Sequence, residues 1–502
     1  MLALHVRHAH LLREGEEPSR LQLTSQGVLD PTPMVMAPEY LRRARALART
    51  ASVRESSNAV VQLTLAECEL SAGNAGAARR AAERSATLSP PDMRGAALAT
   101  QALASFADHH EARAIDLLRS PHVTELASWL GTGRLISASI DPSLAPCTAL
   151  TDPNRVTVRI PCRVQLNRVT RNRTVTVRVA APEQRVLDGA RVVGGEWIVL
   201  DADDRAFVHG VSDATTSHIR GSEFATALGG AERNRILWSG DDRLLLHAPR
   251  IDREHSGRAV LLATGTRANF SRWLLEAIGR LSEVPEMLLE PDIRFVVPSQ
   301  LSPMQRERLS WLGIGDDRLA TVDDDEIVSF EELVLVRHRT HGGCVDAQVI
   351  SWLRDKLTVP DIVTSAPPTR RLFLRSTTSE VTRLLVNELE LERLCRVHGF
   401  EAVDVDALSL AQCRDLFADA ACIVSAEQPL LANLLFAPRG TEVVILAPRS
   451  FARPRHAALA HSLGQSVTFV LGAERPTRAA YPNWEFAVDP ENVQVALARA
   501  AG

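Results

Sequence analysis

The feature of this chain that most restricts its fold is a regular alternation, beyond residue 257, of short apolar runs with amphipathic segments. Each apolar run is short and rich in Val, Ile and Leu, as in a buried strand, and each amphipathic segment has helical spacing. Strands that alternate with helices in this way form βαβ units with a largely parallel sheet. The expected strands are residues 259–264, 293–298, 332–338, 371–375, 401–405, 422–425 and 442–448.

The helices expected between these strands carry start and stop signals. Ser409 precedes an amphipathic segment and predicts a helix start, whereas Gly399 predicts a helix end. The segment 363–370, VTSAPPTR, indicates a linker between two successive α/β units. Two such units leave a cleft between them, and ligands bind there at the carboxyl ends of the strands. The expected helices are residues 271–281, 302–314, 386–400, 409–420 and 429–436.

Two different sequence patterns precede the α/β region. Residues 36–130 are rich in Ala, Leu and Arg at helical spacing, and the segment 59–90 is similar to one tetratricopeptide unit, although any alanine-rich helical hairpin would share much of this pattern. Residues 154–210 alternate branched apolar residues with arginine, which predicts short antiparallel strands. The expected domains are a helical, tetratricopeptide-like module (1–140), an N-terminal lobe with a β-rich entry (150–365) and a C-terminal Rossmann-like lobe (366–502).

Charge and cysteine content narrow the class of protein. The 57 basic and 61 acidic residues are interspersed and give a net charge of −4, which argues against a nucleic-acid or anionic-membrane partner. The seven cysteines are odd in number and form no CxxC pair, so we expect neither a disulfide framework nor a zinc site. This cysteine usage fits a cytoplasmic location, which we expect. We expect no secretory signal, because Arg7 and three histidines interrupt the apolar residues near the start, and no membrane-spanning helix, because no apolar run is long enough.

Three stretches of the α/β region carry a more specific pattern: NFSRWLLEAIGRL at 269–281, SPMQRERLSWLGI at 302–314, and the run from RRLFLR at Arg370 to EVVIL at Leu446. In this order they resemble glycosyltransferase family 61, and the likeness extends from Leu187 to Leu446. That family includes bacterial capsular-polysaccharide proteins and eukaryotic xylosyl- and N-acetylglucosaminyl-transferases.

The resemblance implies an α/β fold of the GT-B type, with two Rossmann-like domains of which the C-terminal one binds a nucleotide sugar. It implies inverting transfer from that donor, a UDP-sugar being expected, to a glycan or lipid-linked acceptor in bacterial surface polysaccharide biosynthesis. No metal ion is expected. The helical module would dock the acceptor or a protein partner.

The chain departs from the family pattern at three places. The family commonly has His before the Trp of its first motif, where this chain has Arg272, and Glu in the last strand, where this chain has Ile445. The family loop G-x-H-G-A-G-L-x-N keeps only Leu431 and Asn433. Its other positions are occupied by Ser425, Glu427, Gln428, Pro429 and Leu430. These changes leave open an alternative: a catalytically inactive relative that serves as a glycan- or partner-binding scaffold.

The resemblance assigns the donor to the C-terminal lobe. Arg375 and Arg383 match arginines expected to face the donor diphosphate, and a guanidinium fork suits phosphate oxygens; each would otherwise form a surface ion pair. The loop residues expected to lie against the donor are Ser425, Glu427, Gln428 and Asn433. A Glu427 carboxylate about 5 Å from a phosphate would cost on the order of 3 kcal/mol unless cations offset it.

The resemblance also leads to two catalytic candidates. An inverting transfer needs a base for the acceptor hydroxyl, and Glu276 lies one helical turn past Arg272 on the same face. Glu276 is therefore the expected base, and Arg272 supplies positive charge from the opposite lobe. Their alternatives are a helix-surface glutamate and a salt bridge to a neighbouring carboxylate.

Other polar motifs give weaker indications of function. The run VDDDE at 322–326 is similar to the metal-binding DxD of other sugar transferases, but it lies outside the matching motifs, and acidic runs are usually solvated turns. The chain has no GxGxxG after a strand and no P-loop, which disfavours dinucleotide oxidoreductases and NTPases.

Overall fold

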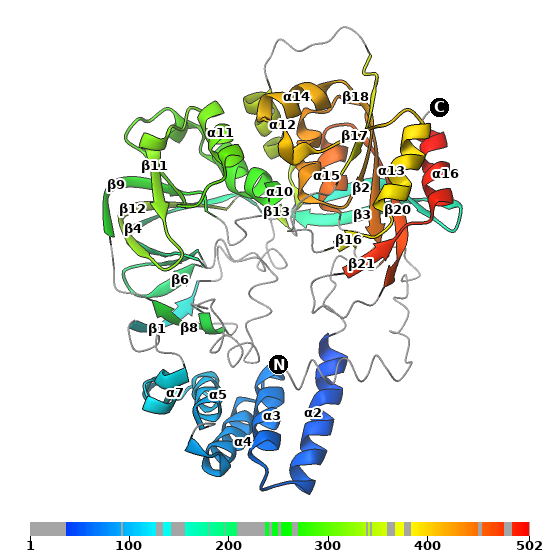
Figure 1. The fold of residues 1–502 in the computed structure, drawn as a ribbon. Helices are drawn as coiled ribbons and strands as arrows, with labels where there is room; N and C mark the ends of the chain where they lie inside the picture. The colour runs from blue at the N-terminus through cyan, green and yellow to red at the C-terminus, as the bar shows by residue number, and fades with distance from the viewer. Residues whose placement is uncertain are drawn as a thin grey trace.

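The computed structural model describes most of the chain (Figure 1). The described residues are 37–91, 94–126, 134–141, 156–179, 181–195, 197–207, 236–239, 243–248, 253–263, 270–337, 340–341, 344–358, 367–375, 383–449, 454–475 and 484–500. They form a mixed α/β structure with helices and two large sheets. None of the helices in these ranges is long and apolar enough to cross a membrane.

The N-terminal part is helical, as the sequence predicts. Asn58 begins one helix by accepting hydrogen bonds from the amides of Val60 and Val61, and Gly73 (φ +76°) turns the chain into the next. Buried alanines such as Ala78 allow the helices to pack closely. The helices are α2 (Ala37–Arg54), α3 (Ala59–Ser71), α4 (Ala75–Leu88), α5 (Arg94–Ala107), α6 (Glu111–Leu118) and α7 (Pro121–Leu126).

The first sheet is mixed, with order β11-β10-β9-β12-β4-β5-β6-β1-β8-β7 in the described residues. The first four of these strands are parallel neighbours, and the antiparallel β12–β4 pair joins them to the rest. Its strands are β1 (Arg134–Ile140), β4 (Glu183–Val193), β5 (Ile198–Leu200), β6 (Arg205–Phe207), β7 (Ile236–Ser239), β8 (Arg243–Ala248), β9 (Arg253–Leu261), β10 (Arg294–Pro298), β11 (Leu319–Val322) and β12 (Ile327–Arg337).

The second sheet has the order β16-β21-β20-β19-β18-β15-β17 in the described residues, and its strands from β20 to β17 are all parallel. The alternating pattern of the sequence predicts this parallel arrangement. Its strands are β15 (Arg370–Leu374), β16 (Arg383–Leu385), β17 (Glu401–Val403), β18 (Ala420–Ala426), β19 (Glu442–Pro448), β20 (Ser466–Arg475) and β21 (Trp484–Ala487).

A hairpin from the β-rich region completes the second sheet. Strands β2 (Val156–Leu166) and β3 (Val169–Val179) are antiparallel, as predicted, and β2 pairs in parallel with β20. This hairpin precedes the first sheet's main strands in sequence, within the range expected for the N-terminal lobe, yet its hydrogen bonds belong to the C-terminal sheet.

A layer of helices lies between the two sheets (Figure 1). One hydrophobic cluster includes Phe295 of β10, Ile445 of β19 and residues of these helices, so the sheets share a core. The helical segments from residue 270 onward are α10 (Phe270–Arg272), η6 (Trp273–Ala277), η7 (Ile278–Glu283), η8 (Pro285–Leu288), α11 (Pro303–Trp311), η9 (Asp316–Arg318), α12 (Ala347–Leu357), α13 (Glu388–Val397), η10 (Val405–Ala407), α14 (Leu410–Ala418), η11 (Pro429–Phe436), α15 (Arg455–Ser462) and α16 (Pro490–Ala500).

The predicted helix signals appear in the structure. Ser409 and Gln412 form a capping box at the start of α14, and Gly399 (φ +79°) follows α13. The segment η11 is a 3₁₀ helix, in which Pro429 occupies the first turn, where a missing N–H costs nothing. The first half of the linker 363–370, residues 363–366, lies outside the described residues.

Candidate functional site

The carboxyl ends of β15, β18 and β19 lie at one edge of the second sheet, because these strands are parallel neighbours. Arg375 follows β15, Glu427 and Gln428 follow β18, and Arg449 follows β19. Ligands of open parallel sheets bind at this edge. The segments 376–382 and 450–453, which continue two of these connections, lie outside the described residues.

The loop between β18 and η11 is buried and held by its own hydrogen bonds. The amide of Glu427 donates to the carbonyl of Leu446 at 2.9 Å. The side-chain amide of Gln428 donates to Ser425 Oγ at 2.8 Å, and the Ser425 hydroxyl donates to the carbonyl of Ala426. The predicted residues Ser425, Glu427 and Gln428 therefore lie together at the expected edge, with their polar groups turned toward the protein.

Glu427 forms a buried hydrogen bond that the sequence does not predict. Its Oε1 atom lies 2.8 Å from Nδ1 of His456 in α15, and both side chains are 5% exposed or less. A carboxylate accepts, so Nδ1 donates the proton. On the other side of the ring, Nε2 lies 3.3 Å from Oγ of Ser271 in α10. His456 thus connects the β18 loop to the segment that contains Arg272 and Glu276.

Arg272 and Glu276 project from an irregular helical segment. The backbone is α-helical at Phe270–Arg272, π-helical at Trp273–Ala277 and 3₁₀ at Ile278–Glu283. Such π turns occur often at functional sites. Buried Trp273 anchors the segment, while the Arg272 Nε and Glu276 Oε1 atoms lie 3.8 Å apart, with Glu276 20% exposed.

Arg455 adds a second arginine to this group. It begins α15, is 7% exposed, and its Nε atom has no hydrogen-bond partner among the described residues. Burial lowers the pKa of Arg455; the Glu276 carboxylate and, to a smaller extent, the Glu427 carboxylate oppose this effect, and Arg272 reinforces it. The guanidinium therefore lies within electrostatic reach of both carboxylates and of a second arginine.

Arg280 is the most deeply buried arginine of this group. It donates to the backbone carbonyls of Leu262 and Ala263, which follow β9, and burial lowers its pKa to about 10. The cluster formed by Arg272, Glu276, Arg280, Arg455, Glu427 and His456 is hereafter the interlayer charge cluster. It contains three arginines and two glutamates, so its charge favours an anionic ligand.

Asn433 lies deeper than the other predicted donor residues. It is fully buried in η11, and its amide donates to the carbonyl of Leu430. Arg308 of α11 donates to Asn433 Oδ1 at 3.4 Å and stacks on Phe270, 4.4 Å from the ring centroid. Asn433 therefore joins the helices of the two α/β halves.

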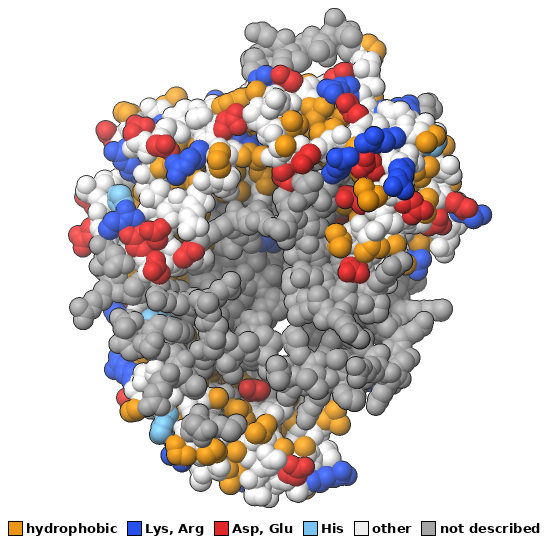
Figure 2. All heavy atoms as spheres, viewed as in Figure 1, with side chains coloured by type: hydrophobic (Ala, Val, Ile, Leu, Met, Phe, Trp, Pro, Cys, Tyr) orange, Lys and Arg blue, Asp and Glu red, His pale blue; other side chains and the backbone are white. Residues whose placement is uncertain are grey.

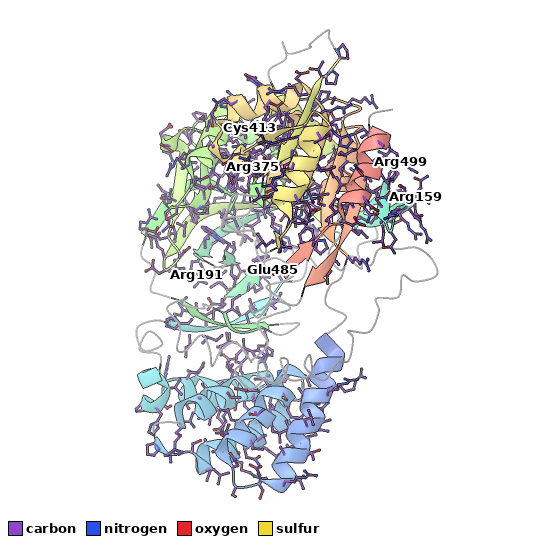
Figure 3. The ribbon with its side chains drawn as sticks, turned by 45° about the vertical axis from the view of Figure 1, so that its right-hand side comes forward. Arg159, Arg191, Arg375, Cys413, Glu485 and Arg499 are labelled. Atoms are coloured by element: carbon purple, nitrogen blue, oxygen red, sulfur yellow. The ribbon has the colours of Figure 1, made fainter. Side chains whose placement is uncertain are left out.

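Of the two arginines expected at the diphosphate, the structure describes the side chain of Arg375 but not that of Arg383. Arg375, which is labelled in Figure 3, forms a bidentate pair with Glu392 of α13, at 2.8 and 2.9 Å, and remains 40% exposed. Arg396 shares the same carboxylate. Arg383 lies in β16, and its side chain is outside the described residues.

Comparison with known proteins places this site in a family. Residues 270–444 match the model of the family Glycosyltransferase 61. This segment therefore carries the pattern of glycosyltransferase family 61. A match to this family indicates glycosyltransferase activity and a glycan acceptor. No curated protein matches the chain. The resemblance inferred from the sequence is confirmed over residues 270–444, whereas residues 187–269 lie outside the match.

The family 61 segment contains Arg272, Glu276, Arg375, Arg383 and the whole β18–η11 loop. His456 and Arg455 lie just beyond its end. Sequence reasoning missed both, although a signal exists: the stretch PRSFARPRH, from Pro448 to His456, places three arginines and a histidine directly after a strand whose carboxyl end meets the expected site. Ser271 was missed because a lone serine carries no such signal.

The acidic run 322–326 is occupied by internal contacts. Glu326 pairs with Arg253, and Asp323 accepts from Ser299. In the parts of the chain that the structure describes, no group of three or more His, Cys, Asp or Glu side chains is arranged to hold a metal ion.

Proposed function

We propose that this family 61 protein transfers a sugar, with inversion, from a nucleotide-sugar donor to a glycan or lipid-linked acceptor in bacterial surface polysaccharide biosynthesis. A UDP-sugar is the proposed donor, and the cytoplasm the proposed location. The observation that carries this proposal is Arg455, a buried guanidinium whose Nε atom lacks a partner among the described residues at the ligand-binding edge of a parallel sheet. A buried cation of this kind is stabilised by an anion such as a diphosphate.

The arrangement of the two sheets supports a GT-B pair of Rossmann-like lobes. The second sheet is parallel from β20 to β17, and the first has the parallel set β11-β10-β9-β12. The helical layer and the interlayer charge cluster lie between them. In such a pair, donor and acceptor meet between the lobes.

In the proposed reaction, Glu276 accepts the proton of the acceptor hydroxyl. The acceptor oxygen attacks the anomeric carbon, the bond from that carbon to the diphosphate oxygen breaks, and UDP leaves with the electron pair. Arg272 and Arg455 stabilise the negative charge that develops on the diphosphate. Glu276 suits the role of base because it is more exposed than Glu427, which is held by His456.

The remaining site residues hold the donor in this proposal. Arg375, kept in place by Glu392, and Arg383 contact the diphosphate from the C-terminal sheet. Gln428, Ser425 and Asn433 shape the β18–η11 loop beside it. In the proposal, the three arginines of the interlayer charge cluster offset the charge of Glu427, whose Oε1 atom accepts a hydrogen bond from His456.

The helical module supplies a docking surface in the proposal. Helices α3 and α4 form a hairpin of tetratricopeptide-like length, with Pro90 after the second helix. Modules of this kind bind extended partners. We assign to it the acceptor or a protein of the assembly apparatus.

A second candidate function is that of an inactive scaffold. It is favoured by one observation: the polar groups of Gln428 and Ser425 bond to each other rather than facing outward. A scaffold would bind a glycan or partner without releasing UDP.

Release of UDP from a panel of UDP-sugars, with and without glycan acceptors, distinguishes the two. We expect the wild-type protein to release UDP and Glu276→Gln to lose this activity while still binding UDP. Glu286→Gln, an exposed acid of η8, is the matched control and keeps full activity. Binding of UDP without turnover in any mixture would support the scaffold instead.

A further inference from the structure

The β2–β3 hairpin concentrates positive charge in a chain whose net charge is −4. From residue 155 to residue 178 the sequence contains no Asp, Glu or Lys. Its arginines are Arg155, Arg159, Arg163, Arg168, Arg171, Arg173 and Arg178. The net charge of the whole chain therefore does not reveal this local excess of arginine.

The hairpin lies at the edge of the second sheet. In the described residues β3 pairs with β2 alone, while β2 also pairs with β20. Arg171 and Arg173 lie opposite Val164 and Cys162, on one face of the ribbon. Arg159, in the other alternating set, lies on the opposite face, and Figure 3 shows it at the periphery of the molecule.

Carboxylates of the same chain neutralise only part of this positive charge. Arg163 pairs with Glu442, and Arg168 pairs with Glu491. Arg159 and Arg171 are exposed, and neither forms an ion pair with another described residue. Their guanidinium groups are therefore accessible to a ligand from solvent.

The hairpin turn has two further properties. Since β2 is parallel to β20, its carboxyl end and the turn at Asn167 and Arg168 lie toward the same edge of the sheet as the candidate site. Val169, directly after the turn, is 51% exposed. An exposed apolar residue between arginines is a feature of surfaces that contact lipid head groups and the upper acyl region.

Protection of a sheet edge explains why charged side chains lie here but not why they are all positive. Charged side chains on an edge strand prevent edge-to-edge aggregation, and Arg171 and Arg173 of β3 fit that role. Arg159 fits it as well, because β2 meets β20 only at residues 163–165. Edge protection does not require charges of one sign, yet residues 155–178 contain no acidic side chain.

We propose that the β2–β3 hairpin binds the surface of an anionic lipid bilayer. Guanidinium forks bind lipid phosphates, and Val169 enters the head-group region. The negative charge of the rest of the chain disfavours a wrapping polyanion such as nucleic acid, whereas a flat membrane needs to contact the hairpin alone. This inference is independent of the proposed transferase activity; if both hold, the hairpin brings the sheet edge toward lipid-linked acceptors.

The test is co-sedimentation of the full chain with vesicles. One set is phosphatidylcholine, and the other contains about one third phosphatidylglycerol. We expect binding to the anionic vesicles only, weakened by high salt. Each arginine near such a surface contributes about fivefold, so Arg159→Gln, Arg171→Gln and Arg173→Gln together should weaken binding about a hundredfold.

The control removes the same charge from elsewhere. Arg42, Arg84 and Arg393 are exposed arginines of α2, α4 and α13, and their triple Gln variant should bind like wild type. The single variants Arg159→Gln and Arg171→Gln, each about fivefold weaker, replace the triple variant if it does not fold. Absence of wild-type binding to anionic vesicles, an equal loss in the control, or tighter binding to duplex DNA than to vesicles would overturn the proposal.

Discussion

The Nδ1 atom of His456 lies 2.8 Å from the Oε1 atom of Glu427 inside the protein. This contact ties the first turn of α15 to the end of β18, and the opposite ring nitrogen reaches Ser271 of α10. Arg455 precedes His456 in the chain, so the same contact positions the guanidinium that we assign to the donor diphosphate. An acidic residue in this loop is therefore compatible with an anionic ligand.

Removal of the Glu427 carboxylate should destabilise the protein. In Glu427→Ala the buried Nδ1 of His456 loses its acceptor, which costs about 1–3 kcal/mol of the free energy of unfolding. Glu427→Gln keeps a carbonyl acceptor and should lose less. Urea unfolding of both variants checks this. If the two variants are equally stable, the contact does not contribute as described.

The Arg308–Asn433 contact should matter for stability in the same way. Asn433→Ala leaves a fully buried guanidinium with fewer acceptors, and we expect a loss of about 1–3 kcal/mol. Asn433→Asp, which offers a charged acceptor, should retain more of the stability than the alanine variant. Chemical denaturation of the two variants provides the comparison, and the reverse order would contradict it.

Glu392 should make stability depend on pH. The guanidinium of Arg375, followed by that of Arg396, holds the pKa of Glu392 below its ordinary value, against the opposing effect of burial. A carboxylate with a depressed pKa stabilises the fold above its unfolded pKa, and this contribution is lost as the pH falls through the folded pKa.

The difference in unfolding free energy between wild type and Glu392→Gln should therefore shrink as the pH falls below about 4. Denaturant titrations at a series of pH values measure it. A difference that stays constant through the acidic range would show that the ion pair is not stabilising.

Gly194 is expected to tolerate no side chain. A Cβ atom at this position would lie 1.8 Å from the backbone carbonyl oxygen of Asp323, so Gly194→Ala must displace the backbone. Overpacking of this kind costs about 1–3 kcal/mol or more. Gly189 has a positive φ but nothing within 4 Å, so Gly189→Ala carries only the backbone strain, about 1–2 kcal/mol. Thermal unfolding should rank Gly194→Ala as the less stable variant.

Local signals in the sequence predicted most elements of the second sheet. Strand β19 spans the predicted residues 442–448. The apolar, β-branched side chains that predict this strand are the same ones that are buried on both of its faces. Ser409 predicted its helix because capping depends on neighbouring residues alone. The pairing of β2 with β20 could not be predicted in this way, since about 300 residues separate them and register depends on tertiary packing.

The candidate site was predictable only in part, for a similar reason. Family motifs brought Glu276, Arg272 and the β18–η11 loop into consideration, but the partner of Glu427 lies 29 residues further along. Likewise, the sequence offered Arg375 as a phosphate ligand without indicating that Glu392, 17 residues away, holds it. Such contacts arise when distant elements pack, so periodicity and motif spacing do not report them.

The most direct test of this account is calorimetric titration of the full chain with UDP. We predict that wild type binds UDP, and that Arg455→Gln binds it about 10- to 100-fold more weakly, because a charge-assisted hydrogen bond is lost. Arg393→Gln, an exposed arginine on α13, should bind like wild type. Absence of wild-type binding, or equal affinity of Arg455→Gln and wild type, would contradict the assignment of Arg455 to a nucleotide-sugar donor.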